Sequence, residues 1–362
     1  MSMRTIAVGR APVGSKVEVH ISASPDKWIS GTANQDGYVA FVADSGLSDS
    51  DIRITAAGYK PYLTYVRWKP QNHQVNVGLD IPGMEMLALP LHHLSVSGND
   101  FINQIGQRVV LNGCDGFMDF RLYMDGGEAA VRPFLDESNE FGFIARRVFM
   151  QGSKAQNQVM QLDPKEPGYY DKVRPFVEFE NARGIIPILT IGIDNQDIRS
   201  PISHWVNICN ITEGLDCIIS YFNEWSKNKS DFNPEDIPPP RSGLWSRGSD
   251  QANGVPRKPS GPVLEFHPVR NYSTAMRDAV ASPIELFEVQ GYRGALVIDE
   301  PGRMGTNAHD ARFTDPRTVG EYARLMSTLC AGVVMHTFNG QRGQLMDALT
   351  RDCAREWTKA IG

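Results

Sequence analysis

The feature that most constrains the fold is a regular alternation of strand-like and helix-like segments from about residue 96 to the end of the chain. Seven short apolar runs have the length and flanking turn residues of buried strands: 109–114, 143–150, 185–191, 217–222, 263–267, 295–299 and 333–338. Helix-like stretches lie between them, at 128–137, 169–183, 202–212, 318–329 and 344–360. This alternation predicts an α/β fold, the (β/α)8 TIM barrel, which typically needs about 250 residues.

A closed barrel of this kind needs an eighth strand, which we expect near residues 243–247. The segment Ser282–Glu285 is a competing candidate, but it reads as a capping box with proline at the first helical position, so we expect a helix there. The stretch 228–262 contains seven prolines and no periodicity. It is either a functional loop above the carboxyl end of the preceding strand or a stretch that conceals an element.

The first 90 residues have a different texture. Short β-rich runs are separated by turn signals; they are 16–21, 28–33, 38–43, 52–56, 62–68 and 74–79. No helix-period stretch interrupts them, and residues 51–56 alternate apolar with polar, so we expect a small all-β sandwich over residues 1–90. Residues 31–41, with Ala57-Gly58-Tyr59 downstream, resemble a carboxypeptidase-regulatory-like sandwich. Proline and glycine at 81–83 and 89–90 predict a linker, followed by a barrel domain over 96–362.

Composition narrows the class of protein. The chain is 41% apolar and 22% charged with a net charge of −6, as in soluble globular proteins, and this mild acidity gives no case for nucleic-acid binding. Apolar runs stay below the ~18 residues of a membrane span, and the first nine residues lack the apolar core of a signal peptide. The five cysteines are scattered and the chain has no glycine-rich phosphate loop, so we expect neither metal nor cofactor. Compartment, including extracellular export after signal removal, and oligomeric state stay open.

Two glutamates, Glu224 and Glu300, stand at the ends of predicted strands. In a barrel the carboxyl ends of the strands meet at the face that carries the chemistry. Two carboxyl groups brought together there have the residue types that split a glycosidic bond, one as an acid and one as a nucleophile. Asp299, directly before Glu300, leaves open which of the two carboxylates faces inward.

Several short motifs resemble clan A glycoside hydrolases, the group that includes family five cellulases and mannanases. Residues 101–113 resemble the hairpin that leads into the first strand of that clan. Asn223-Glu224 is similar to the fourth-strand signature, Asp299-Glu300-Pro301-Gly302 to the end of the seventh strand, and Arg147 to an arginine on the second. The resemblance spans roughly residues 98–362. It departs from the clan at strand eight, where His336-Thr337-Phe338-Asn339 replaces a frequent tryptophan, and in lacking a clear sixth-strand tyrosine.

This resemblance implies a retaining hydrolase that cleaves a β-glycosidic bond of an oligo- or polysaccharide by double displacement. Glu224 would then be the acid/base, Glu300 the nucleophile and Arg147 the residue that orients it, while Asn223 would hold the sugar 2-hydroxyl. Further candidate substrate contacts are His267, His336, Trp245 and Asp115. For the two histidines and Trp245, a purely structural role is the open alternative. At the level of function, the alternative is a catalytically inactive barrel that binds carbohydrate as a recognition module.

Overall fold

In the computed structural model the chain divides into two compact units, Met1–Leu89 and Pro90–Gly362. The structure describes residues 4–9, 14–20, 28–35, 39–43, 49–55, 62–67, 74–78, 94–103, 106–151, 162–192, 201–223, 237–248, 261–268, 276–289, 291 and 293–361. The predicted linker at 81–83 and 89–90 lies outside these ranges.

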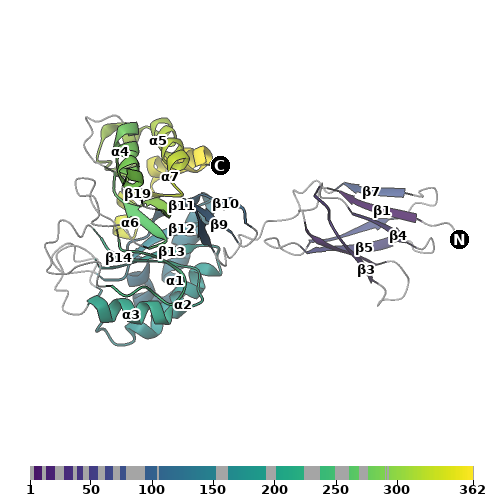
Figure 1. Ribbon diagram of the computed structural model, residues 1–362, viewed down its shortest axis with the longest axis horizontal. Helices are drawn as coiled ribbons and strands as arrows, with labels where there is room; N and C mark the ends of the chain where they lie inside the picture. The colour runs from purple at the N-terminus through teal and green to yellow at the C-terminus, as the bar shows by residue number, and fades with distance from the viewer. Residues whose placement is uncertain are drawn as a thin grey trace. The chain divides into compact units, whose positions relative to one another are not determined.

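The N-terminal unit contains two small sheets (Figure 1). Strands β3 (Trp28–Thr32), β2 (Lys16–His20), β5 (Asp49–Thr55) and β6 (Tyr62–Arg67) form a four-stranded antiparallel sheet in that order. Strand β1 (Arg4–Gly9) lies between β4 (Val39–Ala43), to which it is antiparallel, and β7 (Gln74–Gly78), to which it is parallel. The sequence did not predict β1. A Cβ on Gly31 would meet the ring of Phe41 at 3.1 Å, so the two sheets touch there; the full sandwich stays a prediction.

The second unit is a nearly closed barrel of eight parallel strands, as the alternation predicted. Going around the barrel, the strands are β11 (Leu111–Asp115), β12 (Ala145–Phe149), β13 (Ile186–Gly192), β14 (Ile218–Phe222), β15 (Leu244–Ser246), β16 (Val263–Phe266), β17 (Ala295–Ile298) and β19 (Gly332–Thr337). Strand β19 pairs with β11, so the last strand lies beside the first. Strands β15 and β16 face each other without a backbone ladder, which leaves the barrel slightly open.

The eighth strand is where the sequence placed it. It is β15, which pairs in parallel with β14 through Ile218–Leu244 and Ser220–Ser246. The competing segment 282–285 lies inside helix α4 (Met276–Val289), as expected. Of the proline-rich stretch 228–262, the residues 228–236 and 249–260 lie outside the described ranges.

Helices surround the strands (Figure 1). They are α1 (Asp119–Glu140), α2 (Tyr169–Asn181), α3 (Pro201–Ile211), α4, α5 (Pro316–Leu329), the short α6 (Phe338–Arg342) and α7 (Ala348–Ile361). Helix α1 begins nine residues earlier than predicted because the sequence stretch 128–137 is only its second part. Gly127 interrupts the helix at φ 63° and ψ −155°, a conformation that only glycine adopts readily.

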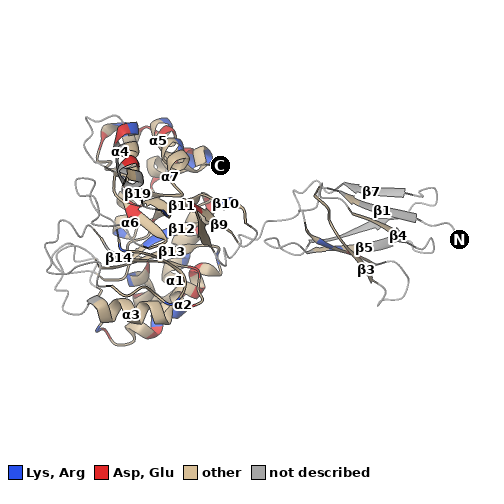
Figure 2. Cartoon of the chain, viewed as in Figure 1, with Lys and Arg blue, Asp and Glu red and all other residues tan. Residues whose placement is uncertain are grey.

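Alternation along the strands divides side chains between the barrel interior and the helix layer. Near the N-terminal ends of the strands the interior is apolar, and Phe101 from the hairpin of β8 (Ser95–Ser97), β9 (Asp100–Ile102) and β10 (Arg108–Val109) fills it together with Leu111, Ile188 and Val334. Near the carboxyl ends the interior becomes polar. Figure 2 shows charged residues of both signs along the outer helices. Two arginines on strand β12, Arg146 and Arg147, are buried.

None of the helices within the described residues combines the length and apolar character that crossing a membrane requires.

Candidate functional site

A buried arginine lies at the centre of the polar end of the barrel. Arg147 is fully buried on β12 and points into the barrel. Its Nη1 donates to Oε1 of Glu300, and its Nη2 donates to Oδ1 of Asn223 at 2.7 Å. The same Nη2 lies 2.9 Å from Oδ2 of Asp299. One guanidinium therefore connects three residues that directly follow β14 and β17 and are 76 residues or more away from it in the sequence.

A histidine extends this cluster on the side of β16. His267 lies one residue beyond β16 and is 1% exposed. Its Nε2 is 3.2 Å from Oδ1 of Asp299 and 3.8 Å from Oε1 of Glu300. The alternation of β16 explains this position, because Leu264 and Phe266 pack against the helix layer, which turns Glu265 and His267 inward.

The charges in the cluster stabilise one another. Burial by itself would raise the pKa of Asp299, but Arg147 and His267 oppose burial, and the net pKa of Asp299 is lowered. Burial works against the positive charge of Arg147, yet Asp299, Glu300 and Glu265 raise the pKa of the guanidinium above its usual value. Asp299 is therefore ionised and Arg147 is charged in the folded protein.

The two neighbouring carboxylates, which the sequence could not rank, differ in access. Asp299 is completely buried between Arg147 and His267, whereas Glu300 retains 6% exposure. A group without exposed surface does not reach a reacting atom on a bound molecule. Of this pair, Glu300 keeps a small exposed surface and Asp299 keeps none.

An aromatic wall covers one side of the guanidinium. The rings of Phe117 and Phe149 stack at 4.1 Å with an interplanar angle of 15°. The guanidinium carbon of Arg147 lies 5.6 Å and 5.2 Å from their centroids, within the range of a cation–π contact. The ring of His336, on β19, lies 5.6 Å from Phe117. His336 is therefore part of the same wall, although it is 1% exposed.

Asp115, at the end of β11, links this first strand of the barrel to the last one, β19. Its Oδ1 accepts hydrogen bonds from the backbone N–H of Thr337 at 3.1 Å and from the hydroxyl of Thr337 at 2.9 Å. Asp115 is 2% exposed. Burial raises the pKa of Asp115 to about 7, against the lowering effect of the Thr337 hydrogen bonds.

The structure thus brings together Arg147, Asn223, Glu300 and His267, with His336 and Asp115 at neighbouring strand ends. Glu224 directly follows Asn223 but lies outside the residues that the structure describes, so its distance from Glu300 is not part of this geometry. Trp245 lies in β15, the expected eighth strand. Its ring packs edge-on against Trp205 of α3 at 6.3 Å. This contact places the ring of Trp245 in the helix layer, away from the cluster around Arg147.

Sequence reasoning missed Phe117, Phe149, Thr337 and Glu265 as neighbours of the site. For Phe149 the signal was present, because it follows Arg147 by two residues on β12, and residues two apart on a strand share a face. Phe117 lies two residues beyond the end of β11, so the period of the strand does not place its ring.

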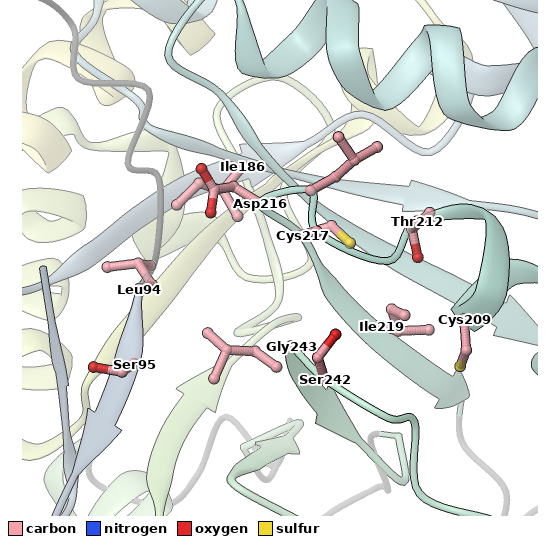
Figure 3. Close-up of a pocket in the computed structure, with 13 residues that line it drawn as sticks. Leu94, Ser95, Ile186, Cys209, Thr212, Asp216, Cys217, Ile219, Ser242 and Gly243 are labelled. Carbon is pink, nitrogen blue, oxygen red and sulfur yellow. The ribbon is translucent and has the colours of Figure 1, made fainter. Parts of the chain in front are cut away.

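A separate cavity of about 230 Å³ lies elsewhere (Figure 3). Its walls include Ile186, Cys217 and Leu244, which stand at the start of β13, β14 and β15. The arginine–carboxylate cluster is at the opposite ends of these strands, so this cavity is not the candidate site. Within the described residues, His, Cys, Asp and Glu form no group of three or more suited to a metal ion.

No protein-family model and no curated protein matches this sequence. The fold does match solved structures. A protein of Bacteroides vulgatus provisionally described as a glycoside hydrolase aligns over 97% of this chain and 76% of its own, with 12% identity and a TM-score of 0.51. A β-glucanase of Saccharophagus degradans, solved with cellotetraose, aligns over 74% and 92% with 13% identity and a TM-score of 0.52. The structural relatives are glycoside hydrolases, and at this identity the likeness shows the fold alone.

Proposed function

We propose that this protein is a retaining glycoside hydrolase that cleaves a β-glycosidic bond in an oligo- or polysaccharide. Glu300 is the nucleophile and Glu224 the acid/base in this proposal. The observation that carries it is the contact of Arg147 with both Glu300 and Asn223, the residue directly before Glu224. Through this one side chain the ends of β14 and β17 are tied together, as a pair of catalytic carboxyl groups requires.

The cluster suits the first chemical step. Arg147 donates to Glu300 and fixes the direction of its carboxylate, so that an oxygen attacks the anomeric carbon while Glu224 protonates the departing glycosidic oxygen. The product of this step is a covalent glycosyl–enzyme ester. Asp299 supplies a buried negative charge that orients Arg147 and His267, and it makes no contact with substrate.

The second step reverses the roles. Glu224, now ionised, takes a proton from water, and the hydroxide attacks the same anomeric carbon and releases Glu300. Two inversions at one carbon retain its configuration. The amide of Asn223 is placed by Arg147 to reach the 2-hydroxyl of the sugar, where hydrogen bonds strengthen in the transition state.

The test is hydrolysis of a panel of aryl β-glycosides and β-linked polysaccharides, with the anomer formed first identified by NMR. We expect release of the β-anomer by the wild type. Glu300→Gln should lower the turnover roughly 10³-fold or more, because amide nitrogen and oxygen do not replace a nucleophilic carboxylate. A 2-fluoro glycoside with a good leaving group should label Glu300 covalently, as read by peptide mass spectrometry.

The matched control is Glu321→Gln on the exposed face of α5, which should leave turnover unchanged. First release of the α-anomer would contradict the retaining mechanism. Sugar binding without hydrolysis of any panel member would favour the carbohydrate-binding barrel instead.

A further inference from the structure

A third carboxyl group lies in the barrel interior beneath the cluster. Glu265, on β16, is completely buried. It is two residues from His267 on the same inward face of the strand. The mechanism above gives it no role, and a fully buried carboxyl group without a role is rare unless it is hydrogen-bonded.

Two hydroxyl groups face Glu265 from the neighbouring strands. The hydroxyl of Ser220, on β14, is hydrogen-bonded to Oε2 of Glu265, and the side chain of Ser246, on β15, is also hydrogen-bonded to this carboxyl group. Ser220 and Ser246 are partners in the β14–β15 pairing and are both completely buried. Glu265 therefore joins β16 to β14 and β15, across the place where the barrel lacks a backbone ladder.

The two charged groups that act on Glu265 affect its ionisation in opposite directions. Asp299, on β17, repels a negative charge on Glu265, and Arg147, on β12, attracts one. That guanidinium is already engaged by Asp299 and Glu300. Burial, followed by Asp299, raises the pKa of Glu265 to about 7 in spite of Arg147 and the two serines. His267, on the same strand, faces Asp299 and Glu300.

We propose that Glu265, enclosed on the inward face of β16 and hydrogen-bonded to Ser220, is a positioning residue that leaves the guanidinium of Arg147 to Asp299 and Glu300. It does so while its carboxyl group keeps its proton. This inference rests on the proposed function for its effect on turnover. When Glu265 loses its proton, three carboxylates compete for one guanidinium. Arg147 then shifts from Glu300, and hydrolysis slows. The two serines stabilise the ionised carboxylate and so lower the pH at which this happens.

The first test does not depend on any activity. Glu265→Gln imitates the protonated form in shape and hydrogen bonding. Because the buried group holds its proton more tightly than the unfolded chain does, raising the pH from 4 to 8 should raise the unfolding equilibrium constant of the wild type on the order of 100-fold more than that of Glu265→Gln. The constants come from urea unfolding at each pH. An equal rise in the two proteins would overturn the proposal, whether or not the protein is a hydrolase.

The second test is the pH profile of turnover with a β-glycoside that the wild type cleaves. Between pH 6 and pH 8 the wild type should lose turnover about tenfold more than Glu265→Gln does, since the ionised fraction rises over this interval. Ser220→Ala removes a donor to the ionised form, so its alkaline limb should move to higher pH. This smaller change also tests the proposal if Glu265→Gln does not fold. Alkaline limbs that coincide in all three proteins would overturn the assignment.

Discussion

At the scale of single residues, Arg147 is the side chain on which the site depends. Its guanidinium is fully buried, donates hydrogen bonds to Glu300 and Asn223, and forms an ion pair with Asp299. Removing one partner of a buried ion pair leaves an uncompensated charge, which costs far more than the pair itself contributes.

We therefore expect Arg147→Met to destabilise the protein by about 3–5 kcal/mol and to abolish hydrolysis. Arg147→Lys keeps the positive charge but lacks the planar group that donates to three acceptors at once. Its free energy of unfolding and its turnover should therefore lie between those of Arg147→Met and the wild type. Urea unfolding and turnover on the same samples measure both effects. Arg174→Met is the matched control, because this exposed arginine pairs with Glu178 on the surface of α2; a similar loss there would contradict the reasoning from burial.

The residues of the site show how far reasoning from the sequence reaches. Glu300, Asn223 and Arg147 were predicted from short motifs at strand ends, and the structure brings these three into contact. The motif at 299–300 did not tell which of the two carboxylates is buried, because both residues follow the last residue of β17, Ile298. The contact of Asp299 with both Arg147 and His267 decides that question.

At the scale of elements, the hairpin β8–β9–β10 fills the N-terminal end of the barrel. Phe101 is fully buried there, while Val96 of the same hairpin is only half-buried. Without Phe101, the apolar side chains around it would border a cavity.

Phe101→Ala should therefore lower the free energy of unfolding by about 3–5 kcal/mol, the usual cost of truncating a buried phenylalanine. Val96→Ala should cost roughly 1 kcal/mol or less, because a smaller, partly exposed group is removed. Thermal and urea unfolding of both variants provide the comparison. Equal losses of unfolding free energy in Phe101→Ala and Val96→Ala would show that the hairpin does not complete the core of the barrel.

The eighth strand shows what the sequence could not predict about a single element. Strand β15 has only three residues, too few to show a period of their own. Its position near 243–247 was predicted because a barrel needs one more strand between 222 and 263. Trp245 falls within this expected strand and was a candidate substrate contact, but the pairing of Ile219 with Trp245 turns its ring toward the helices. Which face a three-residue strand presents is decided by its neighbour.

At the scale of the whole molecule, buried acids couple stability to pH. Asp115 holds its proton up to a pKa of about 7, against an ordinary value of 3.8. Between these two values the unfolded chain releases its proton while the folded protein keeps it. The unfolded state then binds fewer protons, so the folded protein loses stability as the pH rises from about 4 to about 7.

Asp115→Asn removes this dependence while keeping an oxygen for Thr337. Its free energy of unfolding should fall less than that of the wild type between pH 4 and pH 8, by a margin on the order of 4 kcal/mol. Urea unfolding at both pH values measures the difference. Asp352→Asn, on the exposed side of α7, should track the wild type. A pH dependence unchanged by Asp115→Asn would show that this acid is ionised in the folded protein.

The sequence by itself determined the alternation of strands and helices, and with it the parallel barrel and the strand ends at which functional groups lie. These are local properties, because hydrophobic period and turn residues act over a few neighbouring positions. Only the tertiary structure decided that one guanidinium joins the ends of β14 and β17, that Asp299 is buried beneath Glu300, and that Glu265 lies among two serines. Those contacts join residues 45 to 153 positions apart. They form only when the barrel closes, because closure sets which inward side chains share its interior.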